Sequence, residues 1–191
     1  MNKSLLRAKY RQLRGELNPK EINHRSTLII KNLMNTFDFS HKTVSLFLPI
    51  KSKGEVDTFP ILNLLYKQGA KIGLSVSNFE THEMKHLCYS PETILTENNY
   101  GIPEPQSGTE LPPLKFDIVL VPLLAVDVKG NRVGYGKGFY DRFLSACPKD
   151  CVFIGLHLFE PEKHPISNDS NDIPLHYIVT PSQVINCTIE T

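Results

Sequence analysis

The sequence has no long hydrophobic run and no excess of charge of either sign. Lysine and arginine together number 21 and aspartate and glutamate 20, which gives a formal net charge of +1. A broad basic surface that would neutralise the phosphates of a nucleic acid is therefore excluded, and we expect no nucleic-acid partner. No stretch approaches the roughly 20 apolar residues of a membrane-spanning helix, and residues 1–14 lack the apolar core of a secretory signal. These absences predict a soluble cytoplasmic protein with no membrane partner.

Cysteine and histidine lack the spacings of metal sites. No Cys-x-x-Cys pair occurs among the four cysteines, which are Cys88, Cys147, Cys151 and Cys187. This argues against structural zinc and a disulfide scaffold, so we expect buried free thiols. The seven histidines show neither ligand spacing nor a recognisable Ser-His-Asp arrangement.

Internal repeats, low-complexity tracts and long Ser/Gly linkers are absent as well. A chain of 191 residues that is 40% hydrophobic suits one compact domain. Such a domain buries roughly 70% of the surface that its unfolded chain exposes. We therefore predict a single domain over residues 1–191, and we expect a monomer.

Apolar and turn-forming segments alternate along the chain. Helices are predicted over 2–17, from an N-cap at Asn18 onwards, over 59–69 and directly after the glycines at 134–138. Strands are predicted over 43–50, 71–76, 85–89, 116–127, 151–158 and 175–180, while 90–115 is predicted to be a long loop. This alternation favours an α/β fold of three layers, a mostly parallel sheet with helices on both faces. Ligands of such sheets lie beyond the carboxyl ends of the strands.

Three glycines at alternate positions, Gly134, Gly136 and Gly138, connect a predicted strand to a helix. Each costs roughly 0.5 to 1 kcal/mol of backbone entropy relative to alanine. A bound phosphate explains three glycines together, because amides without a nearby Cβ approach an anion closely and Arg132 and Lys137 add positive charge. A sharp turn with tight packing explains one or two of them and is the alternative. The segment matches neither a Walker P-loop nor a dinucleotide fingerprint.

Charged residues around the glycines have two interpretations each. Asp141 suits either a Mg²⁺ that bridges phosphate oxygens or a helix cap or salt bridge with Arg142 or Lys137. Four basic residues share one face of the first predicted helix: Lys3, Arg7, Arg11 and Arg14. Spacing alone favours a solvated basic face, whereas packing against the glycines favours a contact with an anion.

Two further segments carry polar side chains near predicted strand ends. Glu55 and Asp57 either hydrogen-bond the amino groups of a heterocycle or cap the next helix. Tyr100 offers a stacking ring and Glu104 another carboxylate, although an ordinary proline-rich loop explains this segment equally simply.

Four segments together resemble one known family: GEVDT (54–58), YGIPEP (100–105), VPLLAVDVKGNRVGYGKGFYDR (121–142) and DIPLHYIVTP (172–181). They resemble the 5-formyltetrahydrofolate cyclo-ligases, also called methenyltetrahydrofolate synthetases. The resemblance implies a fold related to the sugar-phosphate isomerase and CoA-transferase group. It also implies an ATP- and Mg²⁺-dependent conversion of 5-formyltetrahydrofolate to 5,10-methenyltetrahydrofolate, through phosphorylation of the formyl oxygen, with release of ADP and phosphate. Such chemistry needs positioning and charge neutralisation more than a protein nucleophile.

The same resemblance implies roles for individual residues. The implied ATP-binding residues are Lys3, Ser4, Leu5, Leu6, Arg7, Arg132, Val133, Gly134, Tyr135, Gly136, Lys137, Gly138, Phe139 and Tyr140. The implied folate-binding residues are Ile50, Glu55, Gly134, Tyr135, Gly136, Lys137 and Gly138. The implied catalytic residues are Arg132, Lys137 and Tyr140, and the implied Mg²⁺ ligands are Asp141 and Asp172. If these roles hold, Lys137→Ala and Asp141→Ala abolish turnover while stability stays within about 1 kcal/mol.

Two other classes of function share these features. A non-catalytic protein of the same fold would bind folate or nucleotide without releasing ADP. A sugar-phosphate isomerase or acyl-CoA enzyme would use the glycines for a phosphate but would not need Lys3 and Arg7 beside them, and its turnover would be independent of ATP.

Overall fold

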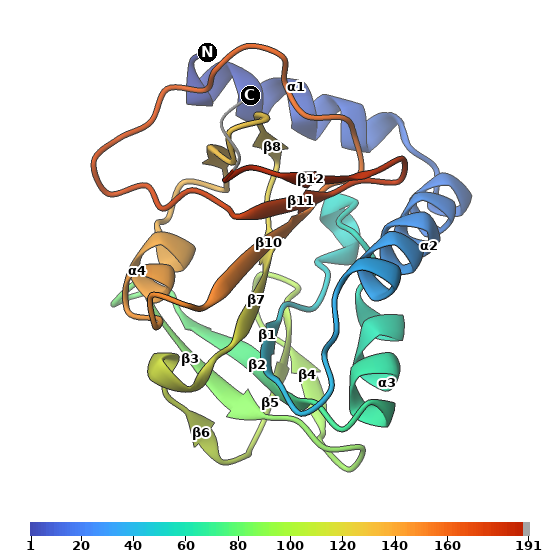
Figure 1. The fold of residues 1–191 in the computed structure, drawn as a ribbon, viewed down its shortest axis with the longest axis vertical. Coiled ribbons are helices and arrows are strands. Elements are labelled where there is room, and N and C mark those ends of the chain that lie inside the picture. Colours follow the sequence, from blue (N-terminus) through green and yellow to red (C-terminus); the bar gives the residue numbers. More distant parts are fainter. Residues whose placement is uncertain (189–191) are drawn as a thin grey trace.

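An eight-stranded sheet runs through the molecule, with the strand order β12-β11-β10-β7-β1-β2-β3-β6 (Figure 1). The computed structural model describes residues 1–188. In chain order the strands are β1 (Thr43–Leu46), β2 (Lys71–Asn78), β3 (Glu83–Cys88), β6 (Glu110–Leu111), β7 (Ile118–Pro122), β10 (Val152–Leu156), β11 (Tyr177–Val179) and β12 (Val184–Asn186). The strands from β11 to β2 pair in parallel, and the remaining three pair antiparallel at the two ends. The predicted mostly parallel sheet is confirmed.

Helices cover both faces of this sheet, as predicted. They are α1 (Lys3–Glu16), α2 (Pro19–Thr36), α3 (Phe59–Lys67) and α4 (Phe139–Ser145), and the 3₁₀ turns are η1 (Lys51–Lys53) and η2 (Pro113–Lys115). In β7, Ile118 and Leu120 pack in the core beneath α2 and α3, whereas Val119 and Val121 pack in the core beneath α4. A parallel strand buried on both faces explains the unbroken apolar run of β7.

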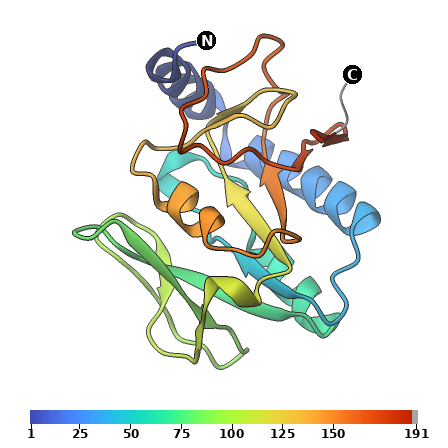
Figure 2. The same cartoon turned by 60° about the vertical axis from the view of Figure 1, so that its left-hand side comes forward.

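Helix α1 takes a different position from the other helices. It lies at one end of the molecule, beyond the strands, in both views (Figures 1 and 2). Its apolar residues Leu6 and Tyr10 pack against Leu124 and Val133, which follow β7 in the chain. The helix therefore lies across the carboxyl ends of the central strands, where ligands of α/β sheets bind.

Local signals fix the start of α2. The side chain of Asn18 accepts hydrogen bonds from the amides of Lys20 and Glu21, and Glu21 accepts one from the Asn18 amide. Pro19 occupies the first helical position within this reciprocal capping box, and a polar N-cap of this kind stabilises a helix by about 1 kcal/mol. The predicted N-cap is confirmed.

Other boundaries differ from the predictions. The segment 90–115 is not one long loop, because it contains β6, η2 and a hairpin of β4 (Leu95–Glu97) and β5 (Pro103–Pro105). The strand predicted over 116–127 ends at Pro122 and continues as a hairpin of β8 (Ala125–Val126) and β9 (Arg132–Val133). Asp127 makes this turn: its carboxylate accepts hydrogen bonds from the amides of Lys129 and Asn131.

The structure describes the cysteines and bears on the prediction that no helix spans a membrane. All four cysteines are free thiols, but only Cys151 is buried, and the other three are half-buried. Across residues 1–188, no helix combines the length and apolarity that crossing a bilayer requires.

Candidate active site

A cavity of about 390 Å³ opens at the carboxyl ends of the parallel strands. Its walls come from the ends of β2 and β7, from α1, from the segment after β1 and from the segment between β9 and α4. The residues predicted from the sequence that line it are Lys3, Arg7, Ile50, Glu55, Arg132, Gly134, Tyr135, Gly136, Lys137, Gly138, Phe139, Tyr140, Asp141 and Asp172. The fold thus brings together residues that are up to 169 positions apart in the chain.

Four residues of the predicted ATP-binding set do not line this cavity. Ser4 and Leu5 are exposed on α1, and the Ser4 hydroxyl donates to the side chain of Asn2. Leu6 and Val133 are buried in the core between α1 and the β8–β9 hairpin. Their contribution is to place the charged residues next to them in the chain.

The three glycines differ in what requires them. Gly136 and Gly138 have positive φ angles of 90° and 70°, a conformation that side chains disfavour. A Cβ atom at Gly138 would also lie 2.8 Å from Nη1 of Arg142. Gly134 has neither constraint, because its φ is not positive and an added Cβ would meet nothing within 4 Å. The turn interpretation therefore explains two glycines, and the third faces the open space of the cavity.

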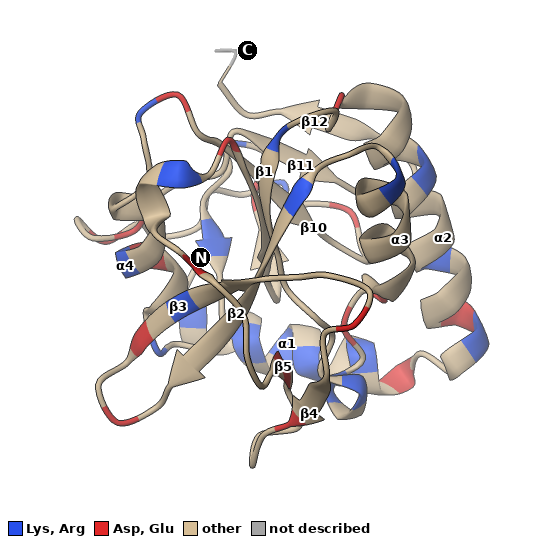
Figure 3. Cartoon of the chain, turned by 90° about the horizontal axis from the view of Figure 1, so that it is seen from below, with Lys and Arg blue, Asp and Glu red and all other residues tan. Residues whose placement is uncertain are grey.

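The basic residues of α1 do not form a solvated face, so the interpretation that spacing alone favours is wrong for three of the four. Nε of Arg7 donates to the Gly134 carbonyl over 3.0 Å, and Nζ of Lys3 donates to Asp169 over 2.6 Å and also to Asp172. Arg14 is buried, and Arg11 alone is exposed. Figure 3 shows Lys and Arg positions recurring along α1. The helix packs against the glycine segment, which is the condition under which these cations contact a bound anion.

The two carboxylates after β1 have separate functions. Asp57 accepts a hydrogen bond from the Phe59 amide at the start of α3, which is the capping interpretation. Glu55 instead lines the cavity, where Oε2 accepts from the Ile50 amide over 2.7 Å and Oε1 from the Tyr135 hydroxyl over 2.6 Å. A buried carboxylate with two fixed donors is suited to accept further N–H groups from a ligand.

Asp141 pairs with Arg132 and also contacts the residue that follows Asp172. Oδ1 of Asp141 accepts from Nη2 of Arg132 over 2.6 Å and from the Ile173 amide over 3.2 Å. Oδ2 of Asp172 accepts from Lys3 and from the Asp169 amide. Burial opposes the charged form of Asp172, but these hydrogen bonds and the charges of Lys3 and Arg132 hold its pKa below the usual range. Of the alternatives for Asp141, a salt bridge is present, but its partner is Arg132 rather than Arg142 or Lys137.

The second oxygen of each carboxylate, Oδ2 of Asp141 and Oδ1 of Asp172, has no hydrogen-bond partner within residues 1–188. No group of three or more His, Cys, Asp or Glu side chains in this part of the chain is arranged to hold a metal ion. Mg²⁺ commonly binds through one or two carboxylates, with phosphate oxygens and water completing its shell. The two free oxygens fit that pattern.

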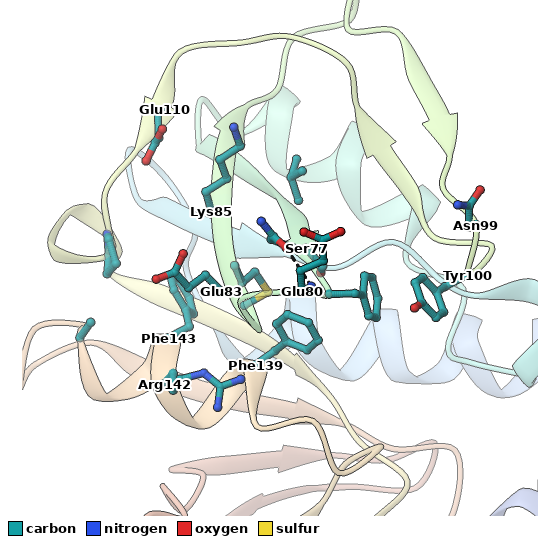
Figure 4. Close-up of a pocket in the computed structure, with 16 residues that line it drawn as sticks. Ser77, Glu80, Glu83, Lys85, Asn99, Tyr100, Glu110, Phe139, Arg142 and Phe143 are labelled. Carbon is teal, nitrogen blue, oxygen red and sulfur yellow. Dashed lines mark hydrogen bonds between the residues drawn. The ribbon is translucent and has the colours of Figure 1, made fainter.

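Aromatic rings separate this cavity from a second, open cleft of about 1050 Å³ between the β2–β3 hairpin and α4 (Figure 4). The rings of Phe79 and Tyr100 stack with centroids 3.7 Å apart, and Phe139 meets Phe79 edge-on at 5.2 Å. Tyr100 lines both cavities, but Phe79 covers one face of its ring. Glu104 lines neither cavity; it accepts a hydrogen bond from the Ser77 amide and ties the β4–β5 hairpin to β2.

Several residues of the cavity have no counterpart among the predicted site residues. They include Ser75, Ser77, Phe79 and Met84. The one available signal was Ser75 and Ser77, two hydroxyls at alternate positions late in a strand that is otherwise largely apolar. Phe79 and Met84 reach the cavity through the β2–β3 hairpin, which no local pattern specifies.

Comparison with known proteins identifies the group to which this fold and site belong. The sequence pattern of the 5-formyltetrahydrofolate cyclo-ligase family matches residues 1–181. This chain belongs to that family. The predicted resemblance and the predicted α/β fold are confirmed, and the chain is an enzyme of the ligase class.

Alignments with individual members of the cyclo-ligase family span most of this chain. The 5-formyltetrahydrofolate cyclo-ligase of Escherichia coli K12 is 34% identical over 155 residues, which span 74% of this chain and 79% of that protein. The enzyme of the same name from Haemophilus influenzae is 29% identical over 178 residues, spanning 91% and 95%. The solution structure of Aquifex aeolicus 5,10-methenyltetrahydrofolate synthetase superimposes with a TM-score of 0.82 at 31% identity, covering 99% of this chain and 94% of the other.

Proposed function

We propose that this protein converts 5-formyltetrahydrofolate to 5,10-methenyltetrahydrofolate with ATP and Mg²⁺, releasing ADP and phosphate. The observation that carries the proposal is the meeting of two kinds of group in one cavity. Six cationic side chains line it, together with a buried acceptor, Glu55. The cations are Lys3, Arg7, Arg11, Lys53, Arg132 and Lys137. Charge of one sign suits a triphosphate, and a fixed carboxylate suits the N–H edge of a pterin.

The reaction requires activation of a poor electrophile. The formyl oxygen attacks the γ-phosphorus, the bond from that phosphorus to the ADP oxygen breaks, and the formyl carbon becomes iminium-like. N10 then attacks this carbon, the carbon–oxygen bond breaks with loss of the N10 proton, and phosphate leaves. Positioning and charge stabilisation supply most of the acceleration in phosphoryl transfer.

The residues around Gly134 suit the phosphate end of ATP. The bare backbone of Gly134 permits close approach of an anion, and Arg7, already fixed on the Gly134 carbonyl, presents its remaining N–H donors beside it. Lys137 is exposed and its side chain makes no hydrogen bond within residues 1–188, so its ammonium group is available to the transferred phosphoryl group. Mg²⁺, held by the free oxygens of Asp141 and Asp172, would neutralise phosphate charge when bound.

Arg132 and Tyr140 line the same cavity. Arg132 is 9% exposed and fixed by Asp141 and the Ile173 carbonyl, so it is preorganised to stabilise charge that develops on the transferred group. Burial raises the pKa of the Tyr140 phenol, and the charge of Glu55 raises it further. The phenol therefore keeps its proton at neutral pH and serves as a hydrogen-bond donor near the reacting atoms.

An absorbance assay tests the proposal. Purified protein incubated with 5-formyltetrahydrofolate and Mg-ATP should produce the near-ultraviolet absorbance of the methenyl product, and omission of ATP should abolish it. Tight folate binding without ADP release would favour a non-catalytic binding protein. Turnover of a sugar phosphate or an acyl-CoA without ATP would favour the isomerase or transferase alternative.

A further inference from the structure

Arg14 is a buried cation that the phosphate contacts of α1 leave unexplained. Its side chain is 5% exposed, its Nη2 donates to the Leu123 carbonyl, and its Nη1 donates to the Tyr135 hydroxyl over 3.1 Å. Its Nε atom has no hydrogen-bond partner, and within residues 1–188 it makes no direct salt bridge. Burial of an ion without a paired charge is unfavourable by several kcal/mol, so a compensating charge is expected nearby.

That charge is Glu55, which Arg14 reaches through Tyr135. The Tyr135 hydroxyl donates to Oε1 of Glu55 over 2.6 Å while it accepts from Arg14. Arginine has donors only, so the phenol oxygen must accept from it and direct its own proton to the carboxylate. Burial and the charge of Glu55 raise the pKa of Tyr135, so the phenol retains this proton.

Hydrogen bonds to both carboxylate oxygens fix the orientation of the Glu55 side chain. Oε1 is held by Tyr135, and Oε2 is held by the Ile50 amide over 2.7 Å. Nζ of Lys53 lies 4.5 Å from the centre of the Tyr135 ring and packs this side chain from another direction. Each carboxylate oxygen keeps a second lone pair. Because Glu55 lines the cavity, these lone pairs can accept hydrogen bonds from N–H groups of a ligand.

We infer that Arg14 is a positioning residue, which acts through Tyr135 to fix Glu55 as the acceptor for N–H groups on the heterocyclic edge of the substrate. The inference rests on the proposed function, because that function assigns Glu55 to the pterin. Arg14 then couples α1, which carries Lys3 and Arg7 for the nucleotide, to recognition of the other substrate.

A purely structural Arg14 would behave differently. In that case it would anchor α1 to the sheet through the Leu123 carbonyl, and its loss would loosen the whole helix. Lys3 and Arg7 lie on the same helix, so nucleotide and folate binding would weaken together. A positioning residue instead affects folate selectively, and only while Glu55 is present.

Direct binding of 5-formyltetrahydrofolate and, separately, of Mg-ATP distinguishes the two. Calorimetry should show that Arg14→Gln weakens folate binding about 10- to 100-fold, as loss of a charge-assisted hydrogen bond does, with Mg-ATP binding within about twofold. The Michaelis constant for folate should rise with little change in kcat. In a Glu55→Gln background, Arg14→Gln should have an effect of less than about twofold, because its only route to the ligand is gone.

Two further variants keep the test decisive. Tyr135→Phe removes one oxygen atom and should reproduce the selective loss of folate binding even if Arg14→Gln folds poorly. Arg25→Gln is the matched control, because Arg25 also joins a helix to a backbone carbonyl, that of Leu158, but lies outside the cavity. It should leave both affinities unchanged.

Three results would overturn the inference: wild-type folate affinity in Tyr135→Phe, equal losses of folate and nucleotide affinity in Arg14→Gln, or full additivity of Arg14→Gln with Glu55→Gln. If the wild-type protein turns over normally, these results reject the role of Arg14 alone. A wild-type protein that neither binds folate nor forms the methenyl product would reject the proposed function, and the inference with it.

Discussion

Nη2 of Arg132 lies 2.6 Å from Oδ1 of Asp141, and Lys3 makes the corresponding contact with Asp172. In each pair, a cation proposed to contact ATP neutralises a carboxylate proposed to hold Mg²⁺. All four residues line one cavity. In the proposed complex, the second oxygens of the two carboxylates would hold Mg²⁺, while Arg132 and Lys3 stay beside them and direct their remaining N–H donors to phosphate oxygens.

This arrangement predicts that ATP and Mg²⁺ bind together far better than either binds alone. Phosphate without the metal would lie beside two carboxylates, and the metal without phosphate would lie beside the positive charges of Arg132 and Lys3. Calorimetric titration with ATP in the presence of a chelator should give an affinity at least about tenfold weaker than titration with Mg-ATP. Equal affinities would show that the carboxylates do not hold the metal.

Substitution of Gly134 separates folding from function. Gly134→Ala should change the free energy of unfolding by less than about 1 kcal/mol, since an added Cβ meets no atom within 4 Å. The methyl group would occupy the space proposed for phosphate, so ATP-dependent turnover should fall at least about tenfold. Denaturant unfolding and the absorbance assay measure the two effects.

Gly138→Ala is the matched comparison. It should lower the unfolding free energy by about 1–3 kcal/mol, because its φ is 70° and Arg142 occupies the space beside it. Full activity in Gly134→Ala would show that the third glycine does not face the phosphate.

The contacts of Lys137 leave its expected behaviour unchanged, whereas those of Asp141 alter it. Lys137→Ala should abolish turnover with stability within about 1 kcal/mol, because Lys137 is exposed. Asp141→Ala should also abolish turnover, but it leaves Arg132 buried without its carboxylate and should destabilise the fold by about 1–3 kcal/mol. Thermal denaturation measures the stability of the two variants, and Asp150→Ala, at an exposed position, is the control. An Asp141 variant as stable as wild type would contradict the importance of this ion pair.

Two buried histidines predict loss of stability in mild acid. Burial lowers the pKa of His86 to about 3, and burial together with the charge of Arg14 lowers that of His157 to about 4. In the unfolded chain both histidines have a pKa near 6.5, so below that pH the unfolded state binds protons that the folded state does not. The free energy of unfolding therefore falls as the pH drops from about 6.5 towards the folded-state pKa values. Each histidine contributes a slope of at most about 1.4 kcal/mol per pH unit.

Denaturant unfolding between pH 7 and pH 4.5 checks this slope. His86→Gln should reduce it, although the variant loses the contact with Ser45 and is less stable throughout. His24→Gln, at an exposed position, should leave it unchanged. An identical slope in His86→Gln would show that His86 is not the group that titrates.

The layers of the fold follow from local patterns. Apolar runs such as that of β7 and the capping box at Asn18 are local features, and both specify their elements correctly. The β8–β9 hairpin was missed because β8 continues the apolar run of β7, so that the two read as one strand ending at the turn that Asp127 and Gly130 make. The β4–β5 hairpin was missed because Asn and Gly mark its turn while two prolines stand within β5.

The site was predictable as a set of residues but not as a set of contacts. Motifs supplied the glycines, Glu55 and the two aspartates, and the cavity gathers them. Spacing on α1 identified four cations, yet it misjudged their exposure, since Arg7 and Arg14 depend on Gly134 and Tyr135 more than 100 residues later. Such pairings arise from the way the helix crosses the strand ends, which local sequence does not encode.

Transfer of the γ-phosphoryl group to the formyl oxygen is the central claim, and isotope transfer tests it most directly. 5-Formyltetrahydrofolate labelled with ¹⁸O in the formyl group is converted with Mg-ATP, and the released phosphate is analysed by mass spectrometry. We predict one ¹⁸O atom in each phosphate. Unlabelled phosphate, released while the methenyl product forms, would contradict the account.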